Sequence, residues 1–300
     1  ALFDPESWQR PINILPADPL AWKASWSMPN AEIIVPAPVA GFIGSDLLAD
    51  VIATRLMEGP SGAMLLDVGT NTEIALWDGR ILHVTSVPGG PAFEGGGIRN
   101  GMAAEAGAIH RVSDGPAGIR CQIMGDGEPR GFCGSGLVDG IAVLRRAGYL
   151  KPSGRFAVSP GAEGYPLIAG NLRTAIAGSD VDAFQRAKAA TAAGMAELLR
   201  RAGLAWGDLR RLCICGAFGR QLDVANAQAV GLLPPIAPTL VELSADAALT
   251  GCERALLTPK GETLFDMSGR QVSPINLSLV ADYETSYINH LRLLPVPASP

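Results

Sequence analysis

Apolar and polar positions repeat with two different periods along the chain, and their order predicts the secondary structure. The continuous apolar run Ala63–Val68 predicts a strand that is buried on both faces. Residues 73–77 and 80–85 alternate between apolar and polar side chains, with the two-residue hairpin signal Asp78-Gly79 between them. The chain therefore contains a predicted meander of three strands, with a polar turn at its first bend.

Helical periodicity appears on both sides of this meander. One helix is expected from the capping residues Ser45 and Asp46 to the Gly59-Pro60 stop, and another between Gly134 and Gly148. Two more are expected at 181–202 and 245–257, with a short buried strand, Leu212–Cys215, between them. Helices that alternate with short buried strands indicate an α/β fold.

The first 38 residues show neither period. They contain seven prolines and three tryptophans without regular spacing, so we expect an irregular segment that wraps against the rest. A single larger domain is expected over residues 39–300.

Composition removes several classes of protein. The 36 glycines and 23 prolines indicate many turns and exclude a coiled coil or simple helical bundle. The net charge of −5 argues against binding to nucleic acid or to an anionic membrane surface. The long uncharged run Val224–Val241 contains three prolines, which a membrane helix would not tolerate, so no membrane association is expected.

The five cysteines are scattered through apolar surroundings, which indicates reduced thiols and a cytoplasmic location. Cys213 and Cys215 share a predicted strand, and we expect their thiols to face opposite sides as separate core side chains. With only three dispersed histidines in addition, the sequence predicts no metal cage.

Asp67 is the first candidate for chemistry, because it lies near the end of a buried strand and is followed by the turn Gly69-Thr70-Asn71-Thr72. A buried carboxylate needs a metal or a set of hydrogen-bond donors. The turn could hold phosphate oxygens while Asp67 orients Mg²⁺ through water. An ordinary Asx-type turn, in which Asp67 accepts bonds from the following backbone, explains the same pattern.

Three glycine-rich loops are further candidates. Gly216-Ala217-Phe218-Gly219 follows the strand 212–215 directly, and ligands of open α/β sheets collect at the carboxyl ends of strands. The loop 89–97 and the helix start Gly134-Ser135-Gly136 could also approach an anion. Each of them also fits a plain tight turn, and for Gly216–Gly219 the local pattern alone favours that interpretation. The sequence contains no Walker-type loop, no G-x-G-x-x-G and no H-E-x-x-H.

Taken together and in order, these segments resemble a known family. They are similar to the ATPase domain of the reductive activators of corrinoid proteins, in the superfamily of acetate and sugar kinases, Hsp70 and actin. The resemblance spans roughly Val39 to Leu257. The matching motifs are Leu65–Ile74, Gly89–Gly95, Gly101-Met102, Gly107–Ile109, Cys133–Leu137, Gly216–Gly219, Leu222-Asp223 and Gly231–Pro234.

The resemblance implies a ribonuclease H-like, two-lobed ATPase fold with ATP and Mg²⁺ in the cleft between the lobes. Residues 63–85 would be the second phosphate-binding hairpin, and 211–257 would be the adenosine region. Asp67 would be the catalytic residue and would hold Mg²⁺ through water. The residues expected at the nucleotide are Gly69, Thr70, Asn71, Thr72, Gly89, Gly90, Glu94, Gly134, Ser135, Gly216, Ala217, Phe218 and Gly219.

In this family ATP hydrolysis drives an electron uphill from a [2Fe-2S] cluster to Co(II) corrinoid, which restores Co(I) for methyl transfer. The resemblance therefore implies a corrinoid protein of a methyltransferase system as partner, and it is compatible with a homodimer. The cysteine set for the cluster and the first phosphate-binding hairpin are expected in a domain before residue 1. Arg220 stands where the family would have Asn after the Gly-Ala-Phe-Gly turn.

Two other functions remain open at this point. The chain could be a nucleotide-sensing or partner-docking module without turnover. The feature that supports this alternative is the absence of the first phosphate-binding hairpin from the sequence. It could also be a small-molecule kinase of the same superfamily, which a phosphorylated sugar or acid product would reveal.

Overall fold

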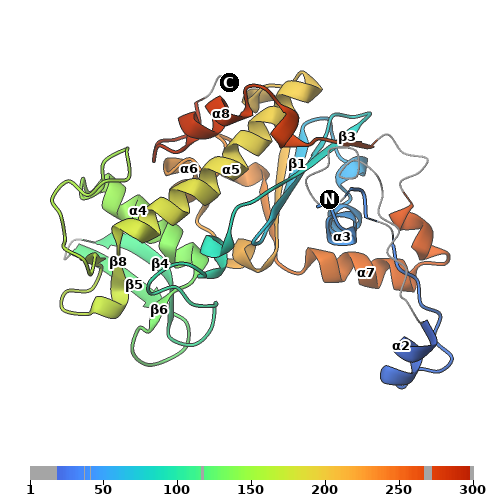
Figure 1. Ribbon diagram of the computed structural model, residues 1–300, viewed down its shortest axis with the longest axis horizontal. Coiled ribbons are helices and arrows are strands. Elements are labelled where there is room, and N and C mark those ends of the chain that lie inside the picture. The colour runs from blue at the N-terminus through green and yellow to red at the C-terminus, as the bar shows by residue number, and fades with distance from the viewer. Residues whose placement is uncertain (1–18, 37, 41, 116–117, 267–271, 298–300) are drawn as a thin grey trace.

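The computed structural model describes residues 19–36, 38–40, 42–115, 118–266 and 272–297. At its centre lies a six-stranded sheet with the strand order β10-β9-β1-β2-β3-β11 (Figure 1). Its strands are β1 (Ala63–Val68), β2 (Thr72–Trp77), β3 (Leu82–Val87), β9 (Arg211–Cys215), β10 (Val241–Ser244) and β11 (Val272–Pro274). β1, β2 and β3 form an antiparallel meander, whereas β9 runs parallel to β1 and β10 runs parallel to β9. The predicted meander and the predicted strand 212–215 are both confirmed.

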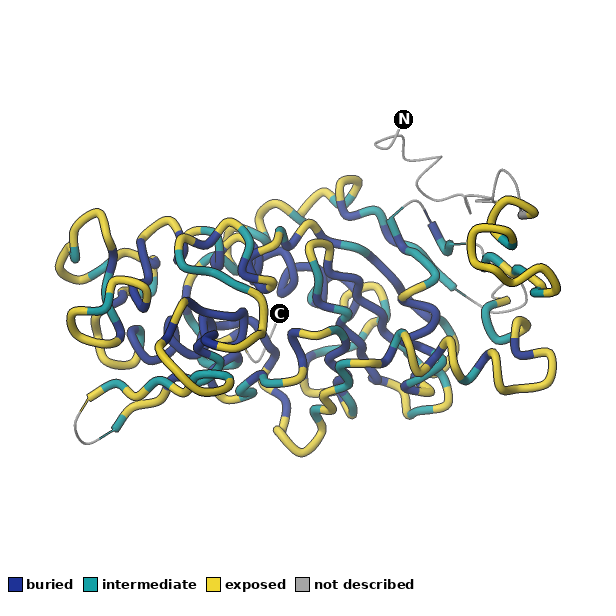
Figure 2. The backbone as a smooth tube through the Cα atoms, turned by 90° about the horizontal axis from the view of Figure 1, so that it is seen from below, coloured by how far each residue is buried: buried dark blue, intermediate teal, exposed yellow. Residues whose placement is uncertain are grey.

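Helices cover both faces of this sheet. On one face α5 (Gly178–Ala202) packs against β2 and β3, and on the other α3 (Ser45–Thr54) packs against α7 (Ala247–Leu257), as Figure 1 shows. Figure 2 shows that the buried backbone is concentrated in the sheet and in the helices beside it. None of the helices in the described segments has the length and the apolar character needed to cross a membrane.

The ends of two helices differ from the prediction. α3 ends at Thr54 because Arg55 adopts a left-handed conformation, with φ of 53°, and residues 56–58 form a separate 3₁₀ turn. α5 begins three residues earlier than position 181. There the Asp180 carboxylate accepts a hydrogen bond of 2.8 Å from the backbone N–H of Ala177 and caps the first turn.

A smaller unit lies beside the main sheet. It contains a three-stranded sheet of order β5-β4-β6, made of β4 (Ala108–Gly115), β5 (Gly118–Ile123) and β6 (Gly131–Phe132), and the helix α4 (Gly134–Arg146). The remaining elements are the strand pair β7 (Tyr165–Pro166) and β8 (Ala175–Ile176), and the helices α6 (Val224–Ala229) and α8 (Tyr283–His290). The sequence patterns did not predict the β4–β5 pair.

A buried carboxylate joins the smaller unit to the main one. Asp139 of α4 is fully buried and accepts hydrogen bonds from the backbone N–H of Val112 at 3.1 Å and from the Asn226 amide at 2.8 Å. Arg111 lies 3.5 Å from Asp139 and 3.0 Å from Asp223, which caps α6. Burial raises the pKa of Asp139 above its ordinary value. These bonds hold α4 in a fixed place between β4 and α6.

Three polar side chains hold a segment close to the C-terminal end of the described residues. Successive backbone carbonyls at 291, 292 and 293 accept hydrogen bonds from Gln185, Lys188 and Arg145, respectively. Lys188 is 1% exposed, and its burial lowers its pKa to about 7. We call residues 291–293 and these three side chains the carbonyl clamp.

Residues 19–25 depart from the expected irregular segment, because they form the short helix α2 (Pro19–Ser25). The helix lies at the periphery of the molecule (Figure 1), and its Trp22 stacks against Trp26 with ring centroids 5.3 Å apart. Both rings are partly exposed. The prediction for residues 1–18 falls outside the described residues.

The thiols of β9 also correct an expectation. Cys213 and Cys215 belong to the same apolar cluster on the α3 face of the sheet, together with Leu65 of β1. Residues two apart on a strand point to the same face, so the expectation that they face opposite sides is wrong. Burial raises the pKa of the Cys213 thiol to about 12 and raises that of Cys215 further. Both are inert core thiols.

Candidate functional site

Four loops that are far apart in the sequence meet at the carboxyl ends of β1 and β9. They are the turn 69–72 between β1 and β2, the loop 88–94 with its 3₁₀ turn Pro91–Glu94, the start of α4 at 133–135, and the 3₁₀ turn Ala217–Gln221 after β9. These loops contain the residues that the sequence singled out. The structure therefore brings the separate motifs to one end of the sheet, where α/β folds bind ligands.

A cavity of about 520 Å³ is lined by residues of the last three of these loops and by Val68 at the end of β1, whereas no residue of the turn 69–72 lines it. Pockets for small molecules and cofactors usually measure about 300–1,000 Å³. The Phe93 and Phe218 rings lie 4.9 Å apart at this cavity. Its lining consists of Val68, Phe93, Glu94, Met102, Ala103, Ala104, Met124, Cys133, Gly134, Ser135, Ala217, Phe218, Arg220 and Gln221. Five of the predicted nucleotide-binding residues are among them: Glu94, Gly134, Ser135, Ala217 and Phe218.

The turn after β1 is tied to the loop that follows β3. The Thr70 hydroxyl donates a hydrogen bond to the Glu94 carboxylate, at 2.5 Å, and the backbone N–H of Gly90 donates to the Thr70 carbonyl at 2.8 Å. A side chain at Gly89 would place its Cβ 3.2 Å from the Thr72 hydroxyl. This close packing fixes the polar turn at the edge of the cavity.

The start of α4 requires glycine at its closest approach to this loop. A Cβ at Gly134 would lie 2.0 Å from the Phe93 carbonyl oxygen, which no side chain can do without displacing the backbone. The neighbouring Ser135 hydroxyl donates to the carbonyl of His110 at 3.0 Å and lies 3.2 Å from the Cys133 thiol. The N-terminus of a helix of 13 residues thus borders the cavity, and helix N-termini attract anions.

Gly216 is the turning point between β9 and the 3₁₀ turn. Its φ of 81° and ψ of 164° fall in a region that residues with a side chain avoid. A Cβ there would lie 3.0 Å from Oδ1 of Asp67 and 3.1 Å from the carbonyl oxygen of Val68. At Gly219 a Cβ would meet the Ile214 carbonyl at 2.8 Å. Both glycines are required by the fold of this turn.

Asp67 does not line the cavity. Its side chain lies on the α3 face of the sheet, where Asp50 of α3 and Glu73 of β2 are its neighbours. Burial raises the pKa of Asp67, and it raises that of Glu73 to about 7, although the Ser86 hydroxyl donates to Glu73 at 2.8 Å. The end of β1 therefore separates an acidic cluster, which we define as Asp46, Asp50, Asp67 and Glu73, from the cavity.

Asp50 is the most buried member of the acidic cluster. Burial, followed by the charge of Asp67, raises its pKa well above the ordinary value. In the described part of the chain no three His, Cys, Asp or Glu side chains are arranged as ligands of one metal ion. Mg²⁺ commonly keeps several waters and takes one or two carboxylates together with phosphate oxygens. The described residues around Asp67 therefore form no metal site made of protein ligands alone.

Several residues of this region were not among those expected at the nucleotide. Arg220, which the sequence marked only as a departure from the family pattern, lies at the cavity, where its guanidinium forms an ion pair with Asp246 at 2.9 Å. Met102, from the matching motif Gly101-Met102, lines the cavity, as do Gln221 and Met124, which belonged to no motif. Asp50 did carry a signal, because it is an acid within the apolar stripe of its helix.

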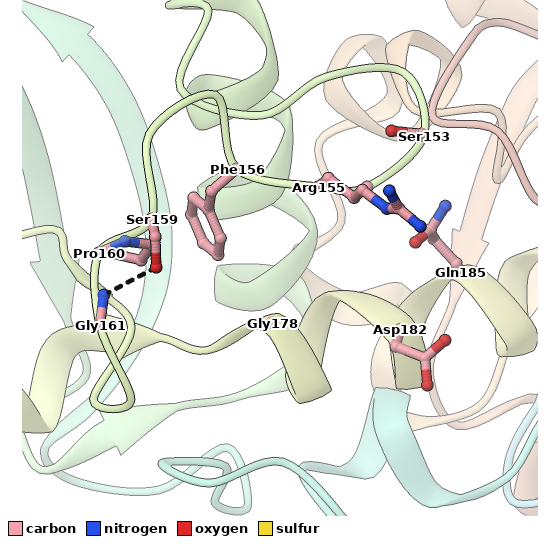
Figure 3. A pocket seen from close by; sticks show the side chains of 10 residues that line it. Ser153, Arg155, Phe156, Ser159, Pro160, Gly161, Gly178, Asp182 and Gln185 are labelled. Atoms are coloured by element: carbon pink, nitrogen blue, oxygen red, sulfur yellow. Dashed lines mark hydrogen bonds between the residues drawn. The ribbon is translucent and has the colours of Figure 1, made fainter.

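A second cavity, of about 440 Å³, lies under the loop 153–161 beside α5. In Figure 3 the Arg155 side chain extends toward Gln185 of α5. This cavity contains none of the predicted site residues and lies outside the four loops described above.

Comparison with known proteins identifies the family. The model of the family described as the "C-terminal domain of RACo the ASKHA domain" matches residues 61–298. The chain belongs to this family. It is 31% identical over 281 residues to the "Corrinoid activation enzyme RamQ" of Eubacterium limosum, covering 87% of this chain and 47% of that protein.

Two further relatives agree with this assignment. The "[Co(II) methylated amine-specific corrinoid protein] reductase" of Methanosarcina barkeri is 29% identical over 242 residues, covering 71% of this chain and 42% of that protein. A solved "Reductive activator for corrinoid,iron-sulfur protein" superposes with a TM-score of 0.80 at 31% identity, covering 89% of this chain and 45% of the other. The α/β ATPase fold expected from the motifs is confirmed. The chain spans about half the length of these relatives.

Proposed function

We propose that this chain is the nucleotide-binding part of an ATP-dependent reductive activator, which returns a corrinoid protein of a methyltransferase system to Co(I). The observation that carries the proposal is the cavity beside the ends of β1 and β9, which Val68 lines together with residues of the loop 88–94, the start of α4 and the 3₁₀ turn after β9. The names of the relatives supply the corrinoid partner.

The base and ribose of ATP would occupy the cavity. The Phe93 and Phe218 rings and the two methionines offer an apolar surface to a flat base. The free N–H groups at the start of α4 offer donors at the same cavity. Glu94 adds an acceptor, which suits a hydroxyl of the ribose.

The phosphates would extend from the cavity toward the turn 69–72. The backbone N–H groups and the hydroxyl of Thr70 lie there, held in place by Glu94 and Gly90. Bound Mg²⁺ would neutralise phosphate charge and stabilise the transition state of phosphoryl transfer. Asp67 would orient the waters of that ion from the other side of the strand.

Filling the cavity tests the binding site. Ala217 is exposed and lines the cavity, so Ala217→Phe should leave the melting temperature near that of wild type and weaken ATP binding at least about tenfold. Ala162→Phe, in a remote exposed loop, is the matched control and should bind normally. Isothermal titration calorimetry with a non-hydrolysable analogue measures both. Equal affinity in all three proteins would contradict the assignment of the cavity.

The iron–sulfur cluster is proposed to lie in a part of the protein other than this chain. Cys133, Cys213 and Cys215 are buried and Cys121 is half-buried, so they are poorly placed to ligate a shared cluster. The 300-residue chain, purified without oxygen, is expected to be colourless. Stoichiometric iron and sulfide with a visible charge-transfer band would overturn this part of the proposal.

A further inference from the structure

Four polar side chains form a connected network behind the candidate nucleotide cavity. The guanidinium of Arg111 on β4 lies between two acids, with its Nη1 atom 3.5 Å from Oδ2 of Asp139 and 3.0 Å from Oδ2 of Asp223. The Asn226 amide donates to Oδ1 of Asp139 at 2.8 Å, and the Asn226 backbone N–H donates to Oδ1 of Asp223 at 2.9 Å. We call these four residues the rear network. In the described structure none of them lines the cavity.

The rear network belongs to the elements that supply two of the cavity walls. Asp139 lies in the second turn of α4, and the start of that helix is one wall. Asp223 follows Gln221, the last residue of the 3₁₀ turn that forms another wall, by two positions. The two walls touch where a Cβ at Gly134 would lie 2.9 Å from the ring of Phe218. A shift of α4 relative to α6 would therefore change the shape of the cavity.

The position of α4 is secured on its β4 side by close packing. A Cβ at Gly136 would lie 1.9 Å from the Ile109 carbonyl oxygen, and the Ser135 hydroxyl donates to the His110 carbonyl at 3.0 Å. On the other side, the hydrogen bonds between α4 and α6 in the described segments all end on Asn226, which bonds Asp139 and Arg146. The rear network is thus the polar connection that places α4 against α6.

Arg111 supplies the charge on which this connection depends. Among the described residues it is the cation that forms an ion pair with Asp139 and with Asp223. Without it the two carboxylates would repel each other across the junction of α4 and α6. Stability alone explains such a buried group poorly, because apolar side chains of similar volume often stabilise a fold as well or better. A fully bonded polar network does, however, fix one particular arrangement.

We propose that Arg111 is a positioning residue for the nucleotide. By pairing with Asp139 and Asp223 it holds α4 against α6, and it thereby sets the separation between the start of α4 and the turn 217–221. It acts through these walls and does not touch the ligand. This inference rests on the proposed function of the cavity.

Two substitutions of Arg111 separate positioning from packing. Arg111→Met keeps an unbranched apolar stem and removes the cation, whereas Arg111→Lys keeps a cation. Both contacts of Arg111 come from the single atom Nη1, so a lysine ammonium can lie between the same two acids. Asp114→Asn is the matched control, because it removes an exposed ion pair between β4 and Arg146 of α4 and leaves the bonds of the rear network in place.

Binding of ATP, measured by calorimetry in the protein of natural length, is the first readout. Arg111→Met should bind at least about tenfold more weakly, and Arg111→Lys and Asp114→Asn should stay within about threefold of wild type. A folded Arg111→Met protein with wild-type affinity overturns the proposal. Equal losses in the methionine and lysine variants overturn it as well, because the retained cation then rescues nothing.

The kinetics of ATP hydrolysis distinguish positioning from a part in the reaction. In Arg111→Met the KM for ATP should rise while kcat at saturating ATP stays near that of wild type. A fall in kcat with an unchanged KM would contradict the assignment. If Arg111→Met does not fold, Asp223→Asn takes its place, since Asn also caps a helix and only the charge is lost. Its KM should then rise, and a wild-type KM overturns the proposal.

Hydrogen exchange of the 300-residue chain is a readout that needs no nucleotide. In Arg111→Met, the amides at 133–138 and at 217–223 should exchange faster together, while those of β1 and β2 keep the protection of wild type. Faster exchange in neither segment, or equally throughout the chain, overturns the positioning role. If wild type binds no ATP, the proposed function fails, and the exchange result alone decides whether Arg111 holds the two walls together.

Discussion

Leu66 and Asp67 are neighbours on β1, yet they point to opposite faces of the sheet and meet opposite surroundings. Leu66 is fully buried in the large apolar cluster that includes Ile74 and residues of α5 such as Met195. Asp67 meets the carboxyl groups of Asp50 and Glu73 beneath α3. One face of the strand is thus built for burial of apolar surface, and the other carries acids that cost free energy to bury. Buried acids of this kind mark a candidate functional site.

The largest effect is expected from the acidic face. Asp67→Ala, in the protein of natural length, should lower ATP turnover by orders of magnitude, because it removes the group proposed to orient the metal. Its melting temperature should change little or rise, since a buried acid is removed. Turnover at saturating Mg²⁺ that equals wild type would show that Asp67 has no such role.

A substitution on the apolar face of β1 should lower the stability of the fold. Leu66→Ala leaves a cavity beside α5 and is expected to lower the free energy of unfolding by about 2–5 kcal/mol. At a temperature where the variant is still folded, its ATP affinity should match that of wild type. Urea unfolding measures the loss, and Leu243→Ala, at a position that is 42% exposed, is the control with a much smaller effect. If Leu66→Ala lowers the free energy of unfolding no more than this control does, the claim that the Leu66 face of β1 stabilises the fold is contradicted.

Gly216→Val should lower both the thermal stability and the ATP affinity. The added side chain restricts φ where the turn needs 81° and brings a Cβ within 3.0 Å of Asp67 Oδ1, so thermal stability should fall. ATP binding should also fall at least about tenfold if the nucleotide passes this turn. Calorimetric titration and thermal unfolding of the same sample measure the pair. A normally folded variant with wild-type affinity would exclude Gly216 from the adenosine region.

The smallest effect concerns pH. Burial raises the pKa of Glu73 to about 7 in the folded protein, from an ordinary value of 4.5. The folded state then holds a proton that the unfolded state has lost, so the free energy of unfolding should fall as pH rises from 4.5 to 7, by at most about 3 kcal/mol. Glu73→Gln removes the titrating carboxyl group and with it this dependence of stability on pH. Urea unfolding across that range should give a flatter profile for the variant, and parallel profiles would contradict the assignment.

The sequence predicts the elements whose signals are local. The strand 63–68 is a continuous apolar run, and Asp78-Gly79 specifies the next hairpin, so the order of residues alone places the meander. The β4–β5 pair escaped prediction because β5 alternates between exposed and half-buried positions and its apolar residues cover only the edge of the core. Strands that are buried on one side alone carry a weak signal when glycines and charges interrupt them.

The candidate site was predictable as a set of loops and not as a geometry. The glycines at 134 and 216 marked close approaches, and both positions require glycine for that reason. Sequence could not reveal that Asp67 faces α3 while its neighbour Val68 lines the cavity, because that depends on which helix covers which face. Asp50 lies one position before Val51 and three after Leu47, inside the buried stripe of α3, and an acid in such a stripe was the available signal.

The carbonyl clamp has a consequence for how the chain is made. Gln185 and Lys188 project from the middle of α5, and their partners at 291 and 292 are synthesised more than a hundred residues later. Until those residues leave the ribosome, a lysine and an amide at the centre of the domain lack the carbonyls that they bond in the folded protein. Chains fold from the N-terminal side during synthesis, so this part of the core must stay hydrated while the meander is already complete. When residues 291–293 dock onto α5, they exclude water from this part of the core and fix the position of the helix.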